Sequence, residues 1–490
     1  MSSLVDQHDL PSPPPAEDDH GSFLAGLFGR GLLYVVVTAA PLLTAMVVSP
    51  VLAHMLGPAQ FGLLAAAISL HQLVMAVAIF GVDQALILVR AESGDDRSPR
   101  MLVTAGTMLA LVLTVAAGAT VGLWSALLGF PTPTLAIVTL CWTVPTTFLE
   151  LGLALLMARD KLRSFAVVSI VLSVGSQVLG LAFLLLGPRT SVIYAWGGIA
   201  GRVLAVAACL FLVRPLWFRR GDWPVVRGAF GLGLPIALSA ISIFVLNSGD
   251  RLVIQRILGS AEAGRYQLAY TIGFEAITVF AFTGEAWAAR FAAVRDDGRR
   301  WALLGQARDH LYELLGPALL AVNLAAPLLL RIFAPPSFRP VGLLLVVLLV
   351  SFSGVPSVAI LGSTRALITQ RRTKPIALAA GVAAVLNLAL NVVLVPRVGL
   401  AGAAAATAVA IGVQALILRV AFRPYRAWPR TSPGVVISLL VSSALATVFA
   451  FVDQSPRWIL IRVLLAALAG GWVILVFVRR RSVHLGVARG

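Results

Sequence analysis

Fourteen apolar stretches follow one another along this chain of 490 residues, and each is about long enough to cross a lipid bilayer. Because hydrocarbon offers the backbone no hydrogen-bond partners, stretches of this length cross a membrane as α-helices. The sequence predicts an all-α polytopic membrane protein with about fourteen transmembrane helices. The predicted spans are residues 31–53, 61–89, 101–128, 135–157, 165–187, 191–213, 229–257, 264–289, 311–333, 341–363, 375–395, 400–418, 433–452 and 458–478.

Composition agrees with this class and argues against others. Apolar residues make up 59% of the chain and charged residues 12%, and the mean hydropathy is +0.93. A soluble domain carries about 25% charged residues. The net charge of +17 comes from basic residues in short gaps between apolar stretches, which does not indicate a nucleic-acid-binding face. The sequence also lacks a phosphate-binding P-loop and common hydrolase motifs, so we expect no cofactor, metal or catalytic residue.

The loops between the predicted spans are asymmetric in charge. Alternate loops and the chain ends carry twenty-eight arginines and lysines on one side of the membrane, and the loops on the other side carry seven. Basic loops stay preferentially in the cytoplasm. This pattern predicts that both termini are cytoplasmic.

Two short motifs recur at nearly constant spacing and indicate an internal repeat. Residues 56–62 (LGPAQFG) match residues 258–264 (LGSAEAG) at four of seven positions, with an offset of 202. Pro188-Arg189 recurs as Pro396-Arg397. Because six spans separate the copies, both halves have the same orientation. We expect two six-helix bundles related by an axis along the membrane normal, plus two C-terminal helices.

The repeat and the charge pattern together predict five segments. Residues 1–22 form a disordered acidic tail rich in proline, 23–213 the N-terminal bundle, and 229–420 the C-terminal bundle. Residues 431–478 hold the last two helices, and 479–490 form a basic cytoplasmic tail.

Polar side chains inside the predicted spans are the candidates for a functional site, because burying them in hydrocarbon is costly. Asn247, Arg251 and Gln255 are spaced four residues apart, so they form one polar stripe along a helix. Arg202 lies near mid-membrane and either reaches a cavity or pairs structurally with Glu150. We expect a central polar cavity with the stripe on one side and Arg202 on the other. Further acids within the spans are Asp83, Asp250, Glu275 and Glu285.

Several of these motifs resemble the polysaccharide-export, or O-antigen-type, lipid-linked oligosaccharide flippases. That family belongs to a superfamily that also includes multidrug exporters and peptidoglycan-precursor flippases. The resemblance rests on residues 56–62 and 80–85 in the first half, and on residues 247–251, 258–266 and 399–407 in the second half. It covers essentially the whole chain, including the fourteen helices and the cytoplasmic termini.

The resemblance implies a flippase that moves an undecaprenyl-pyrophosphate-linked oligosaccharide across a bacterial inner membrane by alternating access. The translocated lipid-linked oligosaccharide would then be used in polysaccharide or lipopolysaccharide biosynthesis. The implied partners are the lipid-linked oligosaccharide, the membrane lipids, and a polysaccharide polymerase or glycosyltransferases, with no nucleic acid. Arg251, Asn247, Gln255 and Arg202 would bind substrate, and Glu275, Asp250 and Glu150 would couple transport to an ion.

Two alternatives remain open from the sequence. Five acids within the spans outnumber Arg202 and Arg251, which would suit a cation-coupled multidrug exporter of the same superfamily. A membrane glycan polymerase or glycosyltransferase is a third class, but the longest predicted outer loop has only about ten residues, from Arg331 to Pro340.

Overall fold

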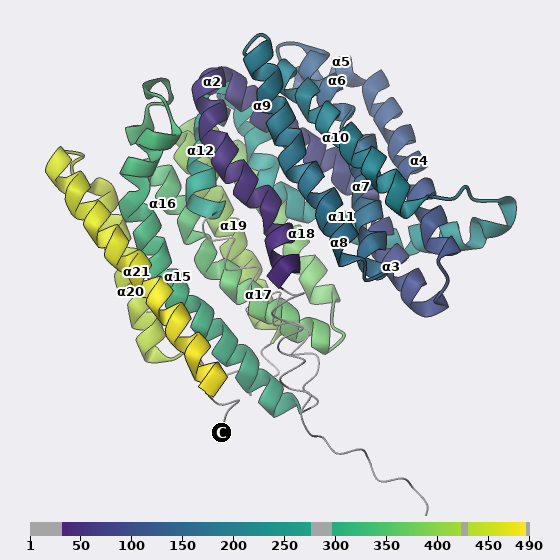
Figure 1. Cartoon of the computed structure of the whole chain (residues 1–490). Coiled ribbons are helices and arrows are strands. Elements are labelled where there is room, and N and C mark those ends of the chain that lie inside the picture. The colour runs from purple at the N-terminus through teal and green to yellow at the C-terminus, as the bar shows by residue number, and fades with distance from the viewer. Residues whose placement is uncertain (1–31, 276–295, 423–429, 487–490) are drawn as a thin grey trace, which may run out of the picture.

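The computed structural model describes residues 32–275, 296–422 and 430–486, and all of its regular elements are helical (Figure 1). The helices of the first half are α2 (Leu32–Ile79), α3 (Val82–Ser93), α4 (Arg97–Ala119), α5 (Val121–Leu127), α6 (Pro133–Leu140), α7 (Thr143–Ala158), α8 (Leu162–Ile170), η2 (Val171–Gly175), α9 (Ser176–Leu186) and α10 (Ser191–Val213). A short η3 (Arg220–Asp222) then leads into the second half.

The second half begins with α11 (Trp223–Ile257), α12 (Ser260–Tyr270) and η4 (Thr271–Glu275). After the undescribed stretch come α15 (Asp297–Phe333), η5 (Pro336–Phe338), η6 (Pro340–Leu343), α16 (Leu344–Phe352), α17 (Gly354–Thr369), α18 (Lys374–Val398) and α19 (Leu400–Ala421). The chain ends with α20 (Pro433–Phe451) and α21 (Pro456–Gly486).

These helices confirm the predicted all-α membrane fold. Twelve helical runs within the described residues are long and apolar enough to cross a membrane. One of these runs, Leu43–Ser93, contains two predicted spans, and the span that begins with α12 is described only to Glu275. The twelve runs therefore account for thirteen of the fourteen predicted spans, and most of the remaining span, residues 264–289, lies outside the described residues. The helix that holds the ninth span begins earlier than predicted, at Asp297, where the Asp296 carboxylate accepts a hydrogen bond from the Arg299 backbone N–H.

Glycines with positive φ make the sharp reversals between neighbouring spans. Gly57 (φ 68°) divides α2 into two arms, Gly259 (φ 90°) precedes α12, and Gly399 (φ 69°) precedes α19. Positive φ is unfavourable for residues with a Cβ atom, whereas glycine adopts it readily. All three turns lie at one end of the helices. The opposite end holds residues 90–100, 159–163 and 370–374, each of which contains three arginines or lysines, and we call it the basic end.

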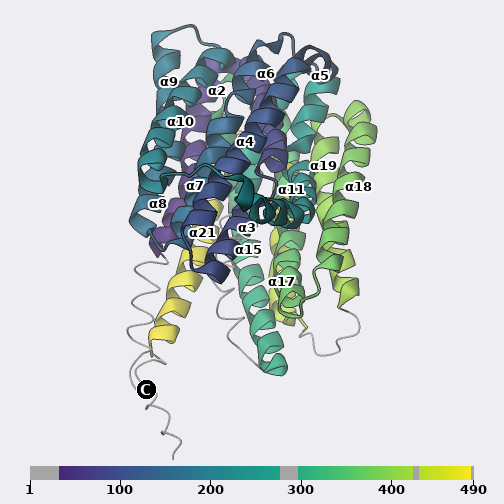
Figure 2. The same ribbon diagram turned by 90° about the vertical axis from the view of Figure 1, so that its right-hand side faces the viewer.

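The helices form two groups, and the last two helices lie outside both. Helices α2 to α10 form the first group, and α11, α12, η4 and α15 to α19 form the second; α2 also packs extensively against α11 and α12, where the two groups meet. Helices α20 and α21 pack along α15 at the edge of the molecule (Figures 1 and 2). We propose that the segment boundaries predicted from the sequence describe the domains of the protein.

The two groups meet at a contact built from the repeated motifs. A Cβ atom on Gly62 would lie 1.7 Å from the Ser260 carbonyl oxygen, and one on Gly264 would lie 2.3 Å from the Pro58 carbonyl oxygen. Gly62 and Gly264 hold the same position in the two copies of the repeat, as do Pro58 and Ser260. Such reciprocal contacts are typical of two units related by a twofold axis. We call these four residues the glycine seam.

Orientation in the membrane can be tested by thiol labelling in intact cells. Replacing Ser93 or Thr373 with cysteine is expected to give a protein that resists an impermeant thiol reagent, because both residues lie at the basic end. Thr132→Cys, at the opposite end, should be labelled. The background would carry alanine in place of the native cysteines, of which Cys141 is exposed. Labelling of Ser93→Cys from outside would show that the basic end is not cytoplasmic.

Candidate functional site

A cavity of about 930 Å³ lies among both groups of helices. Its walls come from α2, α3, α7, the continuous helix α8–η2–α9, and α10 of the first group, and from α11, α12 and η4 of the second. Among its lining residues are Asn247, Arg251, Arg202, Glu150 and Asp83. The fold thus brings residues from opposite halves of the sequence to one internal space.

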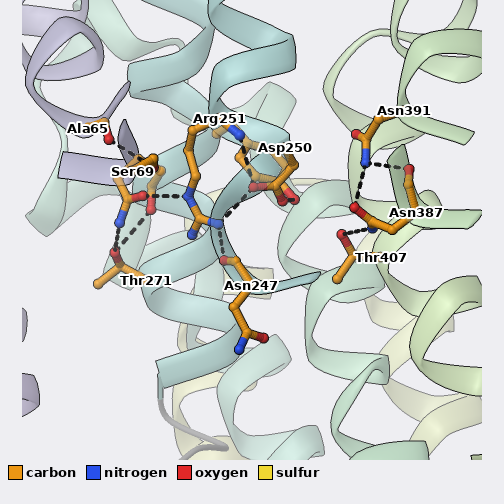
Figure 3. Close-up of polar contacts among 11 residues, drawn as sticks. Ala65, Ser69, Asn247, Asp250, Arg251, Thr271, Asn387, Asn391 and Thr407 are labelled. Atoms are coloured by element: carbon orange, nitrogen blue, oxygen red, sulfur yellow. Dashed lines mark hydrogen bonds and ion pairs between the residues drawn. The ribbon is translucent and has the colours of Figure 1, made fainter. Parts of the chain in front are cut away.

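Arg251 is held at the cavity wall by partners on its own helix and on α12. Its Nε donates a hydrogen bond to Gln267 Oε1 at 2.9 Å, and its Nη1 donates to the Asn247 carbonyl oxygen (Figure 3). The guanidinium also lies over the Tyr270 ring, 3.9 Å from its centroid. Its Nη2 forms no hydrogen bond with the described residues, so this nitrogen retains donors for a ligand.

Asp250 neutralises Arg251 and does not line the cavity. Its Oδ1 lies 2.8 Å from Arg251 Nη1, and its Oδ2 accepts a 2.6 Å hydrogen bond from the Tyr266 hydroxyl. Asp250 is 1% exposed and Arg251 is 4% exposed. A buried pair of this kind needs both partners, because removing one leaves an uncompensated charge in a medium of low dielectric constant. This geometry gives Asp250 the role of orienting Arg251.

Arg202 faces the same cavity from α10. Its Nε donates to Thr146 Oγ1 and its Nη1 to the Gly198 carbonyl oxygen, both at 3.0 Å. The guanidinium lies over the Trp142 ring, 4.0 Å from the centroid. Within the described residues, no carboxylate forms an ion pair with Arg202, and Glu150 in particular does not. Arg202 therefore keeps its full positive charge and a Nη2 group without a described hydrogen bond.

The acidic residues of the cavity lie on helices of the first group. Glu150 on α7 has neither a hydrogen bond nor an oppositely charged partner among the described residues, and it interacts electrostatically with Asp83 on α3. Asp83 accepts a hydrogen bond from Gln84 Nε2 at 2.8 Å. The side chain of Glu275 and all of Glu285 lie outside the described residues.

Gln255 lies beyond the cavity, at the contact between the two groups. Its Nε2 donates to the Gly129 carbonyl oxygen and to Ser260 Oγ, both at 3.0 Å. The predicted polar stripe is therefore divided: Asn247 and Arg251 line the cavity, whereas Gln255 joins α11 to the turn between α5 and α6. The cavity therefore does not extend along α11 as far as Gln255, near the end of this helix.

Several cavity residues were not identified from the sequence. Trp142 and Thr146 lie eight and four residues before Glu150, the same spacing that revealed the stripe around Arg251, so a search for polar and aromatic residues at that interval could have found them. Gln267 and Tyr270 hold Arg251, but only their packing against α11 shows this. Within the described residues, no group of three or more His, Cys, Asp or Glu side chains could hold a metal ion.

A second buried polar cluster lies outside the cavity, between α18 and α19. Asn387 Nδ2 donates to Thr407 Oγ1 at 3.2 Å, and Asn391 Nδ2 donates to Asn387 Oδ1 at 3.1 Å (Figure 3). All three residues are at most 1% exposed. The cluster joins two helices whose facing surfaces are otherwise rich in alanine, and it satisfies most of its own polar atoms.

Comparison with solved structures identifies the fold. A lipid II flippase MurJ in an inward closed conformation matches with a TM-score of 0.68 and 16% identity, covering 92% of this chain and 99% of that chain. A multidrug resistance MATE family transporter of the MOP superfamily, in an inward-facing conformation, matches with a TM-score of 0.61 and 16% identity, over 84% and 99%. A eukaryotic MATE transporter, AtDTX14, matches with a TM-score of 0.53 and 11% identity, over 86% and 99%. At these identities the matches show a common fold alone.

Comparison of the sequence identifies the family. No curated protein sequence matches the chain significantly. The family model for polysaccharide biosynthesis proteins matches residues 30–287, which is more than half of the chain. This match confirms the resemblance drawn from the short motifs. The chain therefore belongs to the polysaccharide biosynthesis protein family and has the all-helical fold of membrane transporters.

Proposed function

We propose that this protein is a flippase that moves an undecaprenyl-pyrophosphate-linked oligosaccharide across the bacterial inner membrane by alternating access. The observation that carries the proposal is the pair of arginines, Arg202 and Arg251, in one cavity within the membrane-spanning helices. Both guanidinium groups are fixed by neighbouring residues, and both retain Nη2 donors. Planar donors of this kind suit phosphate oxygens.

Arg251 has a carboxylate partner and Arg202 has none among the described residues, so the two arginines are proposed to have different roles in binding the headgroup. Asp250 compensates the charge of Arg251, so this group contributes mainly directed hydrogen bonds. Arg202 has no described carboxylate partner and supplies the uncompensated positive charge that an anionic headgroup needs. The solved structures named above include a lipid II flippase and multidrug resistance transporters, and the family description, polysaccharide biosynthesis, favours a glycan-linked lipid for this chain.

The acids of the cavity supply the ion-coupling part of the proposal. Glu150 faces the cavity without a described partner, so it is the acid best placed to bind a proton or a sodium ion reversibly. Asp250 is engaged by Arg251 and Tyr266, which suits it less to this task. Glu275 stays a prediction from the sequence.

A cation-coupled multidrug exporter is the second candidate function, and one observation favours it. Asp83 and Glu150 both line the cavity, and two carboxylates would attract a cationic drug. The two functions predict different phenotypes for a strain that lacks the protein. A flippase deficiency should remove surface polysaccharide without changing tolerance to cationic dyes. Normal polysaccharide together with new dye sensitivity would establish the exporter instead.

The variants are expressed in the strain that lacks the native protein. Relative to the wild-type protein, Arg202→Gln is expected to lower surface polysaccharide by about tenfold to a hundredfold, because a hydrogen bond to a charged group is lost from the headgroup site. Arg202→Lys should restore part of the activity because it keeps the charge. The matched control is Arg397→Gln, which removes an exposed arginine outside the cavity. Membrane abundance would be measured for each variant. Wild-type polysaccharide levels with Arg202→Gln would contradict the proposed role.

A further inference from the structure

One wall of the cavity is polar but carries no charge. It is formed by the continuous helix α8–η2–α9, which crosses the membrane as one run from Leu162 to Leu186. Four of its cavity-lining residues carry hydroxyl or amide groups, and no charged residue of this helix lines the cavity. We call these four residues the serine–glutamine face: Ser169, Ser173, Ser176 and Gln177.

The helix is irregular at this face. The five residues of η2 (Val171–Gly175) form a π-helical turn between two α-helical stretches. Such turns occur often at functional sites. Ser173 lies within the turn, and Ser176 and Gln177 begin the helix that follows it. From Ser169 to Gln177 the helix rises about 12 Å, which exceeds the length of a single sugar ring.

The serine–glutamine face has unused hydrogen-bonding capacity. Ser176 Oγ is buried and has no partner in the described part of the chain, and the residue is 6% exposed. The Gln177 amide and the Ser169 hydroxyl form no hydrogen bond with described residues. Ser173 donates to the Ser169 carbonyl oxygen at 2.7 Å and keeps its own acceptor sites. Buried polar groups normally find partners, because leaving them unpaired costs free energy.

The face adjoins one of the two cavity arginines. Gly201 on α10 packs so closely against α9 that a Cβ atom there would lie 2.3 Å from the Ser176 Cα atom. Arg202 is the next residue along α10 and faces the cavity. A ligand that places an anionic group at Arg202 therefore has neutral donors and acceptors beside it.

Close packing between α9 and α10 explains only some of the polar residues on the serine–glutamine face. The contact requires glycine at position 201, because a Cβ atom there would meet the backbone of residue 176, and it does not by itself call for a hydroxyl group at position 176. Packing does not explain Gln177, whose long amide side chain faces the cavity from α9, in which the only other polar residue is Ser176. Hydroxyl and amide groups both donate and accept hydrogen bonds, which matches the hydroxyl groups of a neutral sugar.

We infer that the serine–glutamine face binds the glycan of the substrate, beside a pyrophosphate held by Arg202 and Arg251. The inference rests on the proposed flippase function and divides the cavity into two parts. The arginines bind the group that every undecaprenyl-pyrophosphate lipid shares. The serine–glutamine face binds the sugars, which differ between such lipids, and it is therefore the part that determines glycan specificity.

The test compares two probes on the full-length protein reconstituted in lipid nanodiscs. One probe is undecaprenyl pyrophosphate, and the other is the same lipid bearing a neutral oligosaccharide. Wild-type protein should bind the glycosylated probe more tightly. In the double variant Ser173→Ala/Gln177→Leu, the affinity for the glycosylated probe should fall about tenfold, because several hydrogen bonds are lost, while the affinity for the plain lipid stays unchanged.

The matched control is Ser164→Ala/Gln414→Leu, which removes the same groups from residues that do not line the cavity. This variant should bind both probes as the wild type does. Equal affinity of the wild type for both probes, or equal losses for both probes in the double variant, would overturn the glycan site. If Arg202→Gln still weakens binding of both probes in that case, the flippase proposal stands. If the wild type binds neither probe, both proposals are wrong.

Discussion

Gly62→Leu is expected to force apart the two groups of helices at the glycine seam. A Cβ atom at position 62 would lie 1.7 Å from the Ser260 carbonyl oxygen, whereas real Cβ contacts under 3.0 Å are essentially never seen. Because the opposing atom belongs to the backbone, it cannot turn away as a side chain would. Helices α2 and α12 would have to separate by at least about 1.3 Å. We expect a loss of stability of at least about 1–3 kcal/mol, the range for overpacked cores.

Two measurements check this result. The first is the thermal stability of the purified protein in detergent, compared with Gly118→Leu, a matched control at a helical glycine with open space around it. The second is the reactivity of Ala263→Cys, because Ala263 is fully buried beside Gly264. This thiol should be protected when Gly62 is present and reactive when leucine replaces it. A stable Gly62→Leu protein with a protected thiol would show that the seam accommodates leucine, contrary to the expected effect.

Gly264→Leu should have the same effect, because the contact is reciprocal. The Cβ atom would meet the Pro58 carbonyl oxygen at 2.3 Å, which is again backbone. Similar losses in the two single variants would support the twofold relation between the repeats. A large loss in one variant and none in the other would argue that the seam is asymmetric.

Arg251→Ala is expected to abolish surface polysaccharide if the protein is a flippase, with lipid-linked precursor accumulating at the inner leaflet. The substitution removes the donors that face the cavity, and it also leaves Asp250 buried without its cationic partner. Breaking a buried ion pair costs about 3–5 kcal/mol. The single variant therefore cannot separate substrate binding from folding.

A double variant separates the two effects. Asp250→Asn/Arg251→Ala removes the uncompensated carboxylate, so it should recover much of the stability lost in Arg251→Ala while transport stays absent. Arg251→Lys keeps the charge but loses the planar donor geometry, so it should recover only part of the transport. The readouts are thermal stability, membrane abundance and surface polysaccharide. Recovery of transport in the double variant would show that Arg251 serves the fold and not the substrate.

Much of the fold could be predicted from the sequence, because it depends on properties that are local in the chain. An apolar stretch of about twenty residues forms a membrane-spanning helix whatever surrounds it. Glycine motifs mark the reversals at Gly57, Gly259 and Gly399, since few other residues accept positive φ. The repeat of residues 56–62 at residues 258–264 likewise predicted two halves, and its two copies meet at the glycine seam.

The site depends on contacts between distant parts of the chain, and only part of it could be predicted. Helical spacing places Asn247, Arg251 and Gln255 on one stripe, but it does not say which neighbour each residue meets. The tertiary structure directs Arg251 to the cavity and Gln255 to the Gly129 carbonyl oxygen. It also gives Asp250 a partner on α12 in Tyr266.

The same distinction explains why the neutral wall of the cavity was not identified from the sequence. Serines in membrane helices often bond their own backbone or pack against small residues, so their presence in residues 165–187 carries no information by itself. Their significance comes from packing: α9 lies against α10, and this contact brings Ser176 and Gln177 into the same cavity as Arg202. Hydropathy and helical period determine which residues share a helix face, whereas the packing of that face against other helices determines whether it meets lipid, protein or a cavity.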